Sequence, residues 1–153
     1  MPADISALIL GILAFQAANR GFDYVTGDRE NTTFSLTVVE QAMPLWAWGI
    51  GFLAGGVMVG FGMCWRRAEP IIYGAVLLMA MYGALSWGLM LKMVERGTSF
   101  SDFWATVGRG DFVHVFAAWP WDGWRTPMSL VMTAVIWGCF AWGTRVMQKA
   151  RRQ

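Results

Sequence analysis

Residues 44–65 read PLWAWGIGFLAGGVMVGFGMCW and residues 71–91 read IIYGAVLLMAMYGALSWGLML. Neither run contains a charged residue, and the runs are 22 and 21 residues long. At a rise of about 1.5 Å per residue, a helix of either length crosses a hydrocarbon core of about 30 Å. Only Arg66 to Pro70 separates them, and proline is tolerated in the first turn of a helix because its missing N–H has no intrahelical partner there. The sequence therefore predicts an antiparallel hairpin of two transmembrane helices.

A shorter apolar run lies on each side of this hairpin. Met128–Thr144 has 17 uncharged residues and is flanked by Arg125 and Arg145. Ile5–Ala18 has 14 residues before Asn19, a length compatible with a span, an interfacial helix or a cleaved signal, and we expect a span. The expected spans are residues 4–19, 44–65, 70–91 and 127–145, and the expected outer segments are residues 20–43 and 92–126.

The composition is also that of a membrane protein. Hydrophobic residues make up 56% of the 153 residues and charged residues only 14%, whereas a soluble domain has about 25% charged residues. We therefore expect a single domain over residues 1–153. Its fold class is an all-α integral membrane protein with four transmembrane helices, located in the inner (cytoplasmic) membrane.

Basic residues gather in the segments that we assign to the cytoplasm. Short cytoplasmic loops are enriched in Lys and Arg, and four spans then place both termini on that side. The expected cytoplasmic anchors are Arg66, Arg67, Arg145, Lys149, Arg151 and Arg152. A basic tail directly after a span is typical of a contact with anionic lipid. We therefore expect membrane lipid as a partner and no nucleic acid.

The first outer segment allows two interpretations. Thr33–Val38 alternates polar and apolar residues, which is the period of a half-buried strand. Alternatively, Thr37 and Glu40 form a capping box for a short helix that runs towards Pro44. The sequence leaves both interpretations open.

The second outer segment is rich in tryptophan. Ser99 with Asp102, and then Asp111, are typical first residues of two short helices, neither of which is long enough to cross a bilayer. Indole rings favour the headgroup level of a membrane, where the ring is half buried and its N–H stays hydrated. We therefore expect these short helices to lie on the outer surface. The expected interfacial collar consists of Trp104, Trp119, Trp121 and Trp124.

Chemical motifs are scarce in this sequence. His114 is the only histidine, so a second imidazole cannot join it in a haem or metal pair. Cys64 and Cys139 lie near the inner ends of spans and are interpreted as small packing residues. No phosphate loop, nucleophile elbow or paired-carboxylate motif is found, so we expect no enzyme activity, no cofactor and no metal site. The middle of each expected span is free of ionisable groups. Polar groups near the outer boundary are Asn19, Arg20, Asp23 and Glu40.

Small residues recur at four-residue spacing, which lets two transmembrane helices approach closely. The pairs are Gly51 with Gly55, Gly56 with Gly60, and Ala134 with Gly138. These faces serve either packing within the four helices or self-association. Because the second span carries two such faces, we expect a homo-oligomer.

Two segments resemble small four-span membrane proteins that are encoded by phages of actinobacteria. They are VVEQAMPLWAWG at Val38–Gly49 and DGWRTP at Asp122–Pro127. The resemblance implies a phage setting and a holin-like function. A holin accumulates in the inner membrane and assembles at a set time into a lesion that releases or activates a cell-wall hydrolase.

Two other functions remain open at this point. The outer segments could contact a host envelope or membrane protein, as a superinfection-exclusion factor or a modulator of that protein would. The chain could instead be an accessory subunit of a larger membrane complex, with its Trp residues packed on the spans of a partner.

Overall fold

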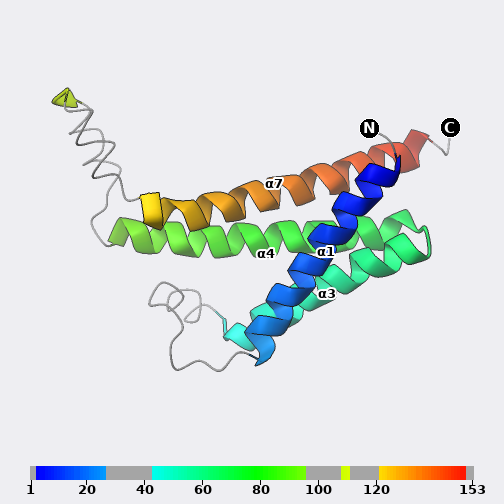
Figure 1. The fold of residues 1–153 in the computed structure, drawn as a ribbon, viewed down its shortest axis with the longest axis horizontal. Coiled ribbons are helices and arrows are strands. Elements are labelled where there is room, and N and C mark those ends of the chain that lie inside the picture. The colour runs from blue at the N-terminus through cyan, green and yellow to red at the C-terminus, as the bar shows by residue number, and fades with distance from the viewer. Residues whose placement is uncertain (1–2, 27–42, 96–107, 111–120, 151–153) are drawn as a thin grey trace.

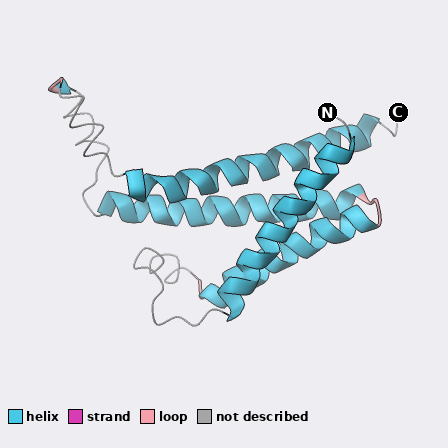
Figure 2. Cartoon of the chain, in the orientation of Figure 1, coloured by secondary structure: helices cyan, strands magenta, loops and turns pink. Residues whose placement is uncertain are grey.

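The computed structural model describes residues 3–26, 43–95, 108–110 and 121–150 of the chain. Long helices dominate these ranges (Figures 1 and 2). The four long helices are α1 (Ala3–Thr26), α3 (Leu45–Cys64), α4 (Ala68–Glu95) and α7 (Trp121–Ala150). The expected outer strand or helix at Thr33–Val38 and the expected short helices of the second outer segment fall largely outside the described residues.

Each of the four helices is long and apolar enough to cross a membrane. The candidate spans are Ile5–Thr26, Leu45–Cys64, Ala68–Leu91 and Thr126–Ala150. The predicted fold class, an all-α membrane protein with four transmembrane helices, is therefore confirmed. The start of α1, the end of α7 and the turn between α3 and α4 lie at the same end of the molecule (Figure 1), which we call the basic end because Arg66, Arg67, Arg145 and Lys149 lie there.

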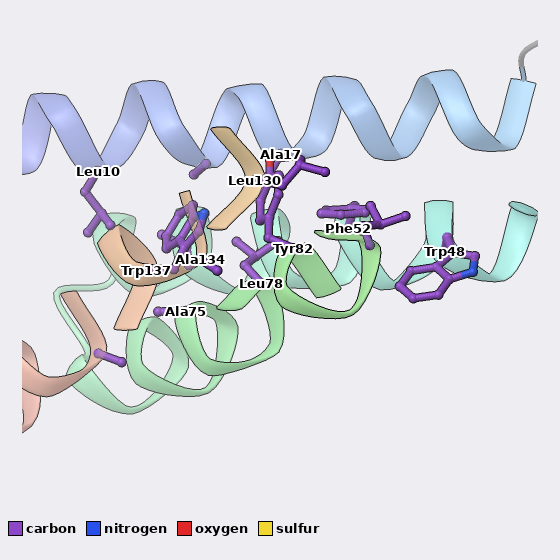
Figure 3. Close-up of a cluster of buried hydrophobic side chains, with 14 of the residues drawn as sticks. Leu10, Ala17, Trp48, Phe52, Ala75, Leu78, Tyr82, Leu130, Ala134 and Trp137 are labelled. Carbon is purple, nitrogen blue, oxygen red and sulfur yellow. The ribbon is translucent and has the colours of Figure 1, made fainter. Parts of the chain in front are cut away.

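The helices pack in a chain of neighbours. Helix α1 packs on α3, α3 on α4, and α4 on α7, and consecutive helices run in opposite directions (Figure 1). All four contribute side chains to one core (Figure 3). At its centre the Phe52 ring meets the Tyr82 ring edge-on, with 4.8 Å between the ring centroids. Large core side chains that are essentially inaccessible are Phe52, Leu78, Tyr82, Leu85 and Trp137.

The outward faces of the same helices are apolar as well. Leu8 of α1, Val57 of α3 and Trp142 of α7 are 65%, 64% and 72% exposed, respectively. A water-soluble monomer rarely exposes contiguous apolar surface on this scale. Lipid tails are the solvent that such faces require, so burial and composition together describe a multi-pass membrane protein.

Helix α1 is longer than the sequence predicted. The expected first span ends at Asn19, but the helix continues to Thr26. Contacts with the other helices explain the extension: the Arg20 guanidinium carbon lies 5.4 Å from the centroid of the Tyr82 ring, and the Tyr24 and Phe52 rings lie 5.9 Å apart. Asn19, Arg20 and Asp23, which we placed at the outer boundary, are therefore part of a continuous helix, and Glu40 lies outside the described residues.

Helix α7 also begins earlier than expected, at Trp121 rather than at Pro127. Proline has no N–H, so Pro127 leaves the carbonyl of Gly123 without its usual intrahelical donor. The Pro127 carbonyl, in turn, accepts a buried hydrogen bond of 2.8 Å from the Ser86 hydroxyl of α4. This bond fixes α7 on α4 at a point where the proline weakens the helix.

The α3–α4 turn is closed by backbone hydrogen bonds. The N–H of Arg66 donates to the Met63 carbonyl at 3.3 Å, and the N–H of Arg67 donates to the Gly62 carbonyl at 2.9 Å, which is the Schellman pattern of a helix C-terminus. Arg66 has φ 53°, the left-handed conformation that glycine usually supplies there. Pro70 lies in the first turn of α4, as predicted. The expected helical hairpin is thus confirmed.

Candidate functional site

The outward face of α1 carries a row of polar side chains. Gln16, Asn19 and Asp23 are all exposed, and their spacing of three and four residues places them on one side of the helix. We call these three residues the α1 polar stripe. Ile12, 59% exposed, and Phe15, 68% exposed, lie beside it, so the stripe is set in an otherwise apolar surface.

The stripe lies within the candidate span. Gln16 sits at the midpoint of Ile5–Thr26, and at 1.5 Å per residue Asn19 lies about 5 Å and Asp23 about 11 Å from that midpoint along the helix. The hydrocarbon core extends about 15 Å on each side of its centre. With a bilayer centred on this candidate span, all three backbone positions lie at hydrocarbon depth, where polar side chains are costly.

Arg20 lies on the same helix but turns towards the core. It is half buried, and its guanidinium lies over the Tyr82 ring, a geometry in which the negative face of the ring attracts the cation. The hydroxyl of Tyr82 is buried and has no hydrogen-bond partner among the described residues. The Arg20–Tyr82 contact therefore joins α1 directly to α4.

The glycine pairs of α3 face its two neighbours. A Cβ atom at Gly51 would meet the Met81 side chain of α4, and one at Gly55 would meet Leu78 of α4 at 2.6 Å. A Cβ atom at Gly56 would instead lie 3.0 Å from the Ala14 carbonyl oxygen of α1. Three of these four glycines thus contact helices of their own chain.

The fourth glycine, Gly60, is different because a Cβ atom there would meet nothing within 4 Å. In α7, Ala134 is buried in the core, and a Cβ atom at Gly138 would lie 3.0 Å from the Met79 sulfur of α4. The small faces of α3 and α7 are therefore used largely for packing within the chain.

Gly60 opens into a groove of about 290 Å³ between α1 and α3. We call this the α1–α3 groove. It is lined mostly by small residues, among them Gly11, Ala14 and Ala18 of α1 and Gly56, Gly60 and Cys64 of α3. The groove exists because α1 and α3 touch near Gly21 and Gly49 and diverge towards the basic end (Figure 1).

The expected cytoplasmic anchors lie partly within the described residues. Arg66, Arg67, Arg145 and Lys149 are all exposed, and they occupy the basic end that also holds the start of α1 (Figure 1). Arg151 and Arg152 lie outside the described residues.

The expected interfacial collar is placed only in part. Trp121 and Trp124 belong to the first turns of α7 rather than to a connecting segment, because that helix begins before Pro127. Trp104 and Trp119 lie outside the described residues, as does His114.

Two further sequence expectations concern reactive side chains. Cys64 and Cys139 are free and exposed, whereas we expected packed small residues; Cys64 lines the α1–α3 groove. Among the described residues, no group of three His, Cys, Asp or Glu side chains is placed to hold a metal ion.

Sequence reasoning missed the α1 polar stripe because it ended the first span at Asn19. The signal was present: Gln16, Asn19 and Asp23 repeat at helical spacing. The sequence did not show which side of the helix faces the core, and that side decides whether the three polar groups face protein or lipid.

Comparison of the chain with protein-family models, with curated proteins and with solved structures gave no match.

Proposed function

We propose that the chain is a phage-type, holin-like protein of the inner membrane that self-associates through the α1 polar stripe, with both termini in the cytoplasm and without enzymatic activity. The observation that carries this proposal is the exposure of Gln16, Asn19 and Asp23 on the outward face of a candidate span. A lone chain leaves these groups against lipid tails. Contact with further copies removes them from lipid.

The two amide side chains of the stripe can pair with their copies in a second chain. The side-chain amides of Gln16 and Asn19 each contain a donor and an acceptor, so two parallel α1 helices related by a two-fold axis can pair amide with amide. Polar pairs between transmembrane helices contribute about 0.6–2 kcal/mol each. The glycines of α3 are a weaker choice for this contact, because Gly51, Gly55 and Gly56 already contact α1 or α4.

A larger assembly supports a lesion by the same chemistry. Asp23 lies nearer to one end of α1 than Gln16 does, so water that reaches Asp23 can continue along the stripe when several copies line it. Water then replaces lipid as the solvent of these groups, which relieves the cost of their burial. Assembly thus favours an opening that a single chain does not form.

Timed expression of the full chain in a bacterium tests the function. We expect membrane potential, followed with a voltage-sensitive dye, to collapse abruptly once the protein reaches a threshold abundance. The double variant Gln16→Leu/Asn19→Leu, inserted at equal abundance, should delay or abolish the collapse. Met132→Leu, a change of similar size on the exposed face of α7, is the matched control and should behave as the unchanged chain.

Three outcomes would contradict the proposal. If potential and viability persist at high membrane abundance of the unchanged chain, holin activity is wrong. If the double variant collapses the potential on the normal schedule, the α1 polar stripe is not the contact. If purification recovers one stoichiometric host membrane protein instead of further copies of the chain, an exclusion factor or an accessory subunit is the better description.

A further inference from the structure

The length of the α1–α3 groove along the helices is close to the thickness of one membrane leaflet. Its wall on α3 runs from Gly56 to Cys64, which is about 12 Å along the helix at 1.5 Å per residue. Half of a hydrocarbon core is about 15 Å. The groove therefore extends from near the middle of the span to the end of α3.

One end of the groove lies at the level of a membrane interface. Helix α3 ends at Cys64, and Trp65 follows, 61% exposed and stacked on Phe61 with 4.0 Å between the ring centroids. Exposed tryptophan at the end of a span marks the headgroup level. Next come Arg66 and Arg67, both exposed and fixed in place by the hydrogen-bonded turn.

We propose that the α1–α3 groove binds one anionic phospholipid, with an acyl chain along Gly60 and Cys64 and the phosphate at Arg66 and Arg67. The apolar lining suits a hydrocarbon chain, and the open space at Gly60 leaves room for it. The two arginines supply the charge complementarity that selects an anionic headgroup, since basic pockets between transmembrane helices bind such lipids. This proposal concerns a single chain and does not rest on the holin-like function.

Native mass spectrometry of the purified full chain, with phosphatidylglycerol or phosphatidylcholine added, tests the proposal. We expect one bound phosphatidylglycerol per chain and weaker retention of phosphatidylcholine. The double variant Arg66→Gln/Arg67→Gln should lower the affinity for phosphatidylglycerol about 30-fold, which corresponds to about 1 kcal/mol per arginine. Glycerol 3-phosphate at millimolar concentration should not displace the lipid, because it lacks the acyl chain.

A substitution inside the groove tests the place of the acyl chain. A Cβ atom at Gly60 meets nothing within 4 Å, so the leucine side chain of Gly60→Leu should project into the groove and abolish retention of phosphatidylglycerol. Gly83→Leu of α4, where a Cβ atom also meets nothing within 4 Å, is the matched control and should retain the lipid. If Gly60→Leu does not fold, as judged by size-exclusion chromatography, the arginine variant decides the proposal by itself.

The opposite results would overturn the proposal. Equal retention of both lipids, or unchanged affinity in the arginine variant, would show that Arg66 and Arg67 do not bind the headgroup. Equal retention of phosphatidylglycerol by the Gly60 and Gly83 variants would show that the acyl chain does not lie in the groove. Displacement of the lipid by glycerol 3-phosphate would mean that the site binds a phosphate group rather than a membrane lipid.

Discussion

Replacing Gly21 by alanine should separate α1 from α3. A Cβ atom at position 21 would lie 2.7 Å from the Gly49 carbonyl oxygen and 2.7 Å from the Leu53 backbone nitrogen. Both are backbone atoms of a helix, so neither can rotate away as a side chain could. Restoring ordinary contact at about 3.4 Å requires a local separation of about 0.7 Å between the helices, in a layer that is packed as densely as a protein interior.

Overpacking of this kind costs about 1–3 kcal/mol. Alanine also favours a helix over glycine by about 1 kcal/mol, which offsets part of that cost. Gly83→Ala in α4 is the matched control, because a Cβ atom at position 83 meets nothing within 4 Å. The difference between the two variants therefore isolates the clash, and we expect Gly21→Ala to be the less stable by about 1–3 kcal/mol.

Unfolding in mixtures of mild detergent and sodium dodecyl sulfate, followed by tryptophan fluorescence, measures this difference. Gly49→Ala provides a second reading from the other side of the contact, because its Cβ atom would lie 2.7 Å from the Gly21 carbonyl oxygen. Equal free energies of unfolding for Gly21→Ala and Gly83→Ala would show that α1 and α3 do not approach each other in this way.

Three smaller effects should be measurable by the same unfolding assay. Ser86→Ala removes the hydroxyl that donates to the Pro127 carbonyl and should cost about 0.6–1.7 kcal/mol; no loss would mean that the bond does not fix α7 on α4. Arg66→Gly relieves a left-handed conformation and should stabilise the chain by about 1 kcal/mol in neutral detergent, whereas a loss would contradict the turn geometry. In a double-mutant cycle, Arg20→Gln and Tyr82→Leu should show a coupling of about 0.5–2 kcal/mol, and additive effects would exclude the cation–π contact.

The central hairpin could be predicted closely because charged residues mark the ends of its apolar runs. The uncharged run from residue 44 to residue 65 is followed at once by Arg66 and Arg67, and α3 ends at Cys64. Because a connection of five residues is too short to reach elsewhere, the next helix must run antiparallel beside the first. Hydropathy and length were therefore sufficient for this part of the fold.

The limits of α1 and α7 could not be predicted from local sequence. Asn19 and Arg20 look like the end of a span, yet tertiary contacts of Arg20 and Tyr24 keep the helix intact to Thr26. Pro127 looks like a first helical residue, yet α7 begins at Trp121. For α1, contacts with other helices outweigh local preference.

The sequence also did not show which helices the glycine faces of α3 contact. Helical periodicity separates the face of Gly51 and Gly55 from that of Gly56 and Gly60, but it does not say which helix each face meets. The structure assigns the first pair to α4 and Gly56 to α1, and leaves Gly60 open. The α1 polar stripe became recognisable only when the inward side of α1, with Ala14, was known.

Cysteine cross-linking in native membranes examines self-association through α1. In a chain that carries Cys64→Ser and Cys139→Ser, Asn19→Cys places a single thiol on the α1 polar stripe, and Met132→Cys places one on the exposed face of α7. We predict that mild oxidation yields a covalent dimer at position 19 and little or none at position 132. A chain that stays monomeric at position 19, or that cross-links equally at both positions, would contradict the account.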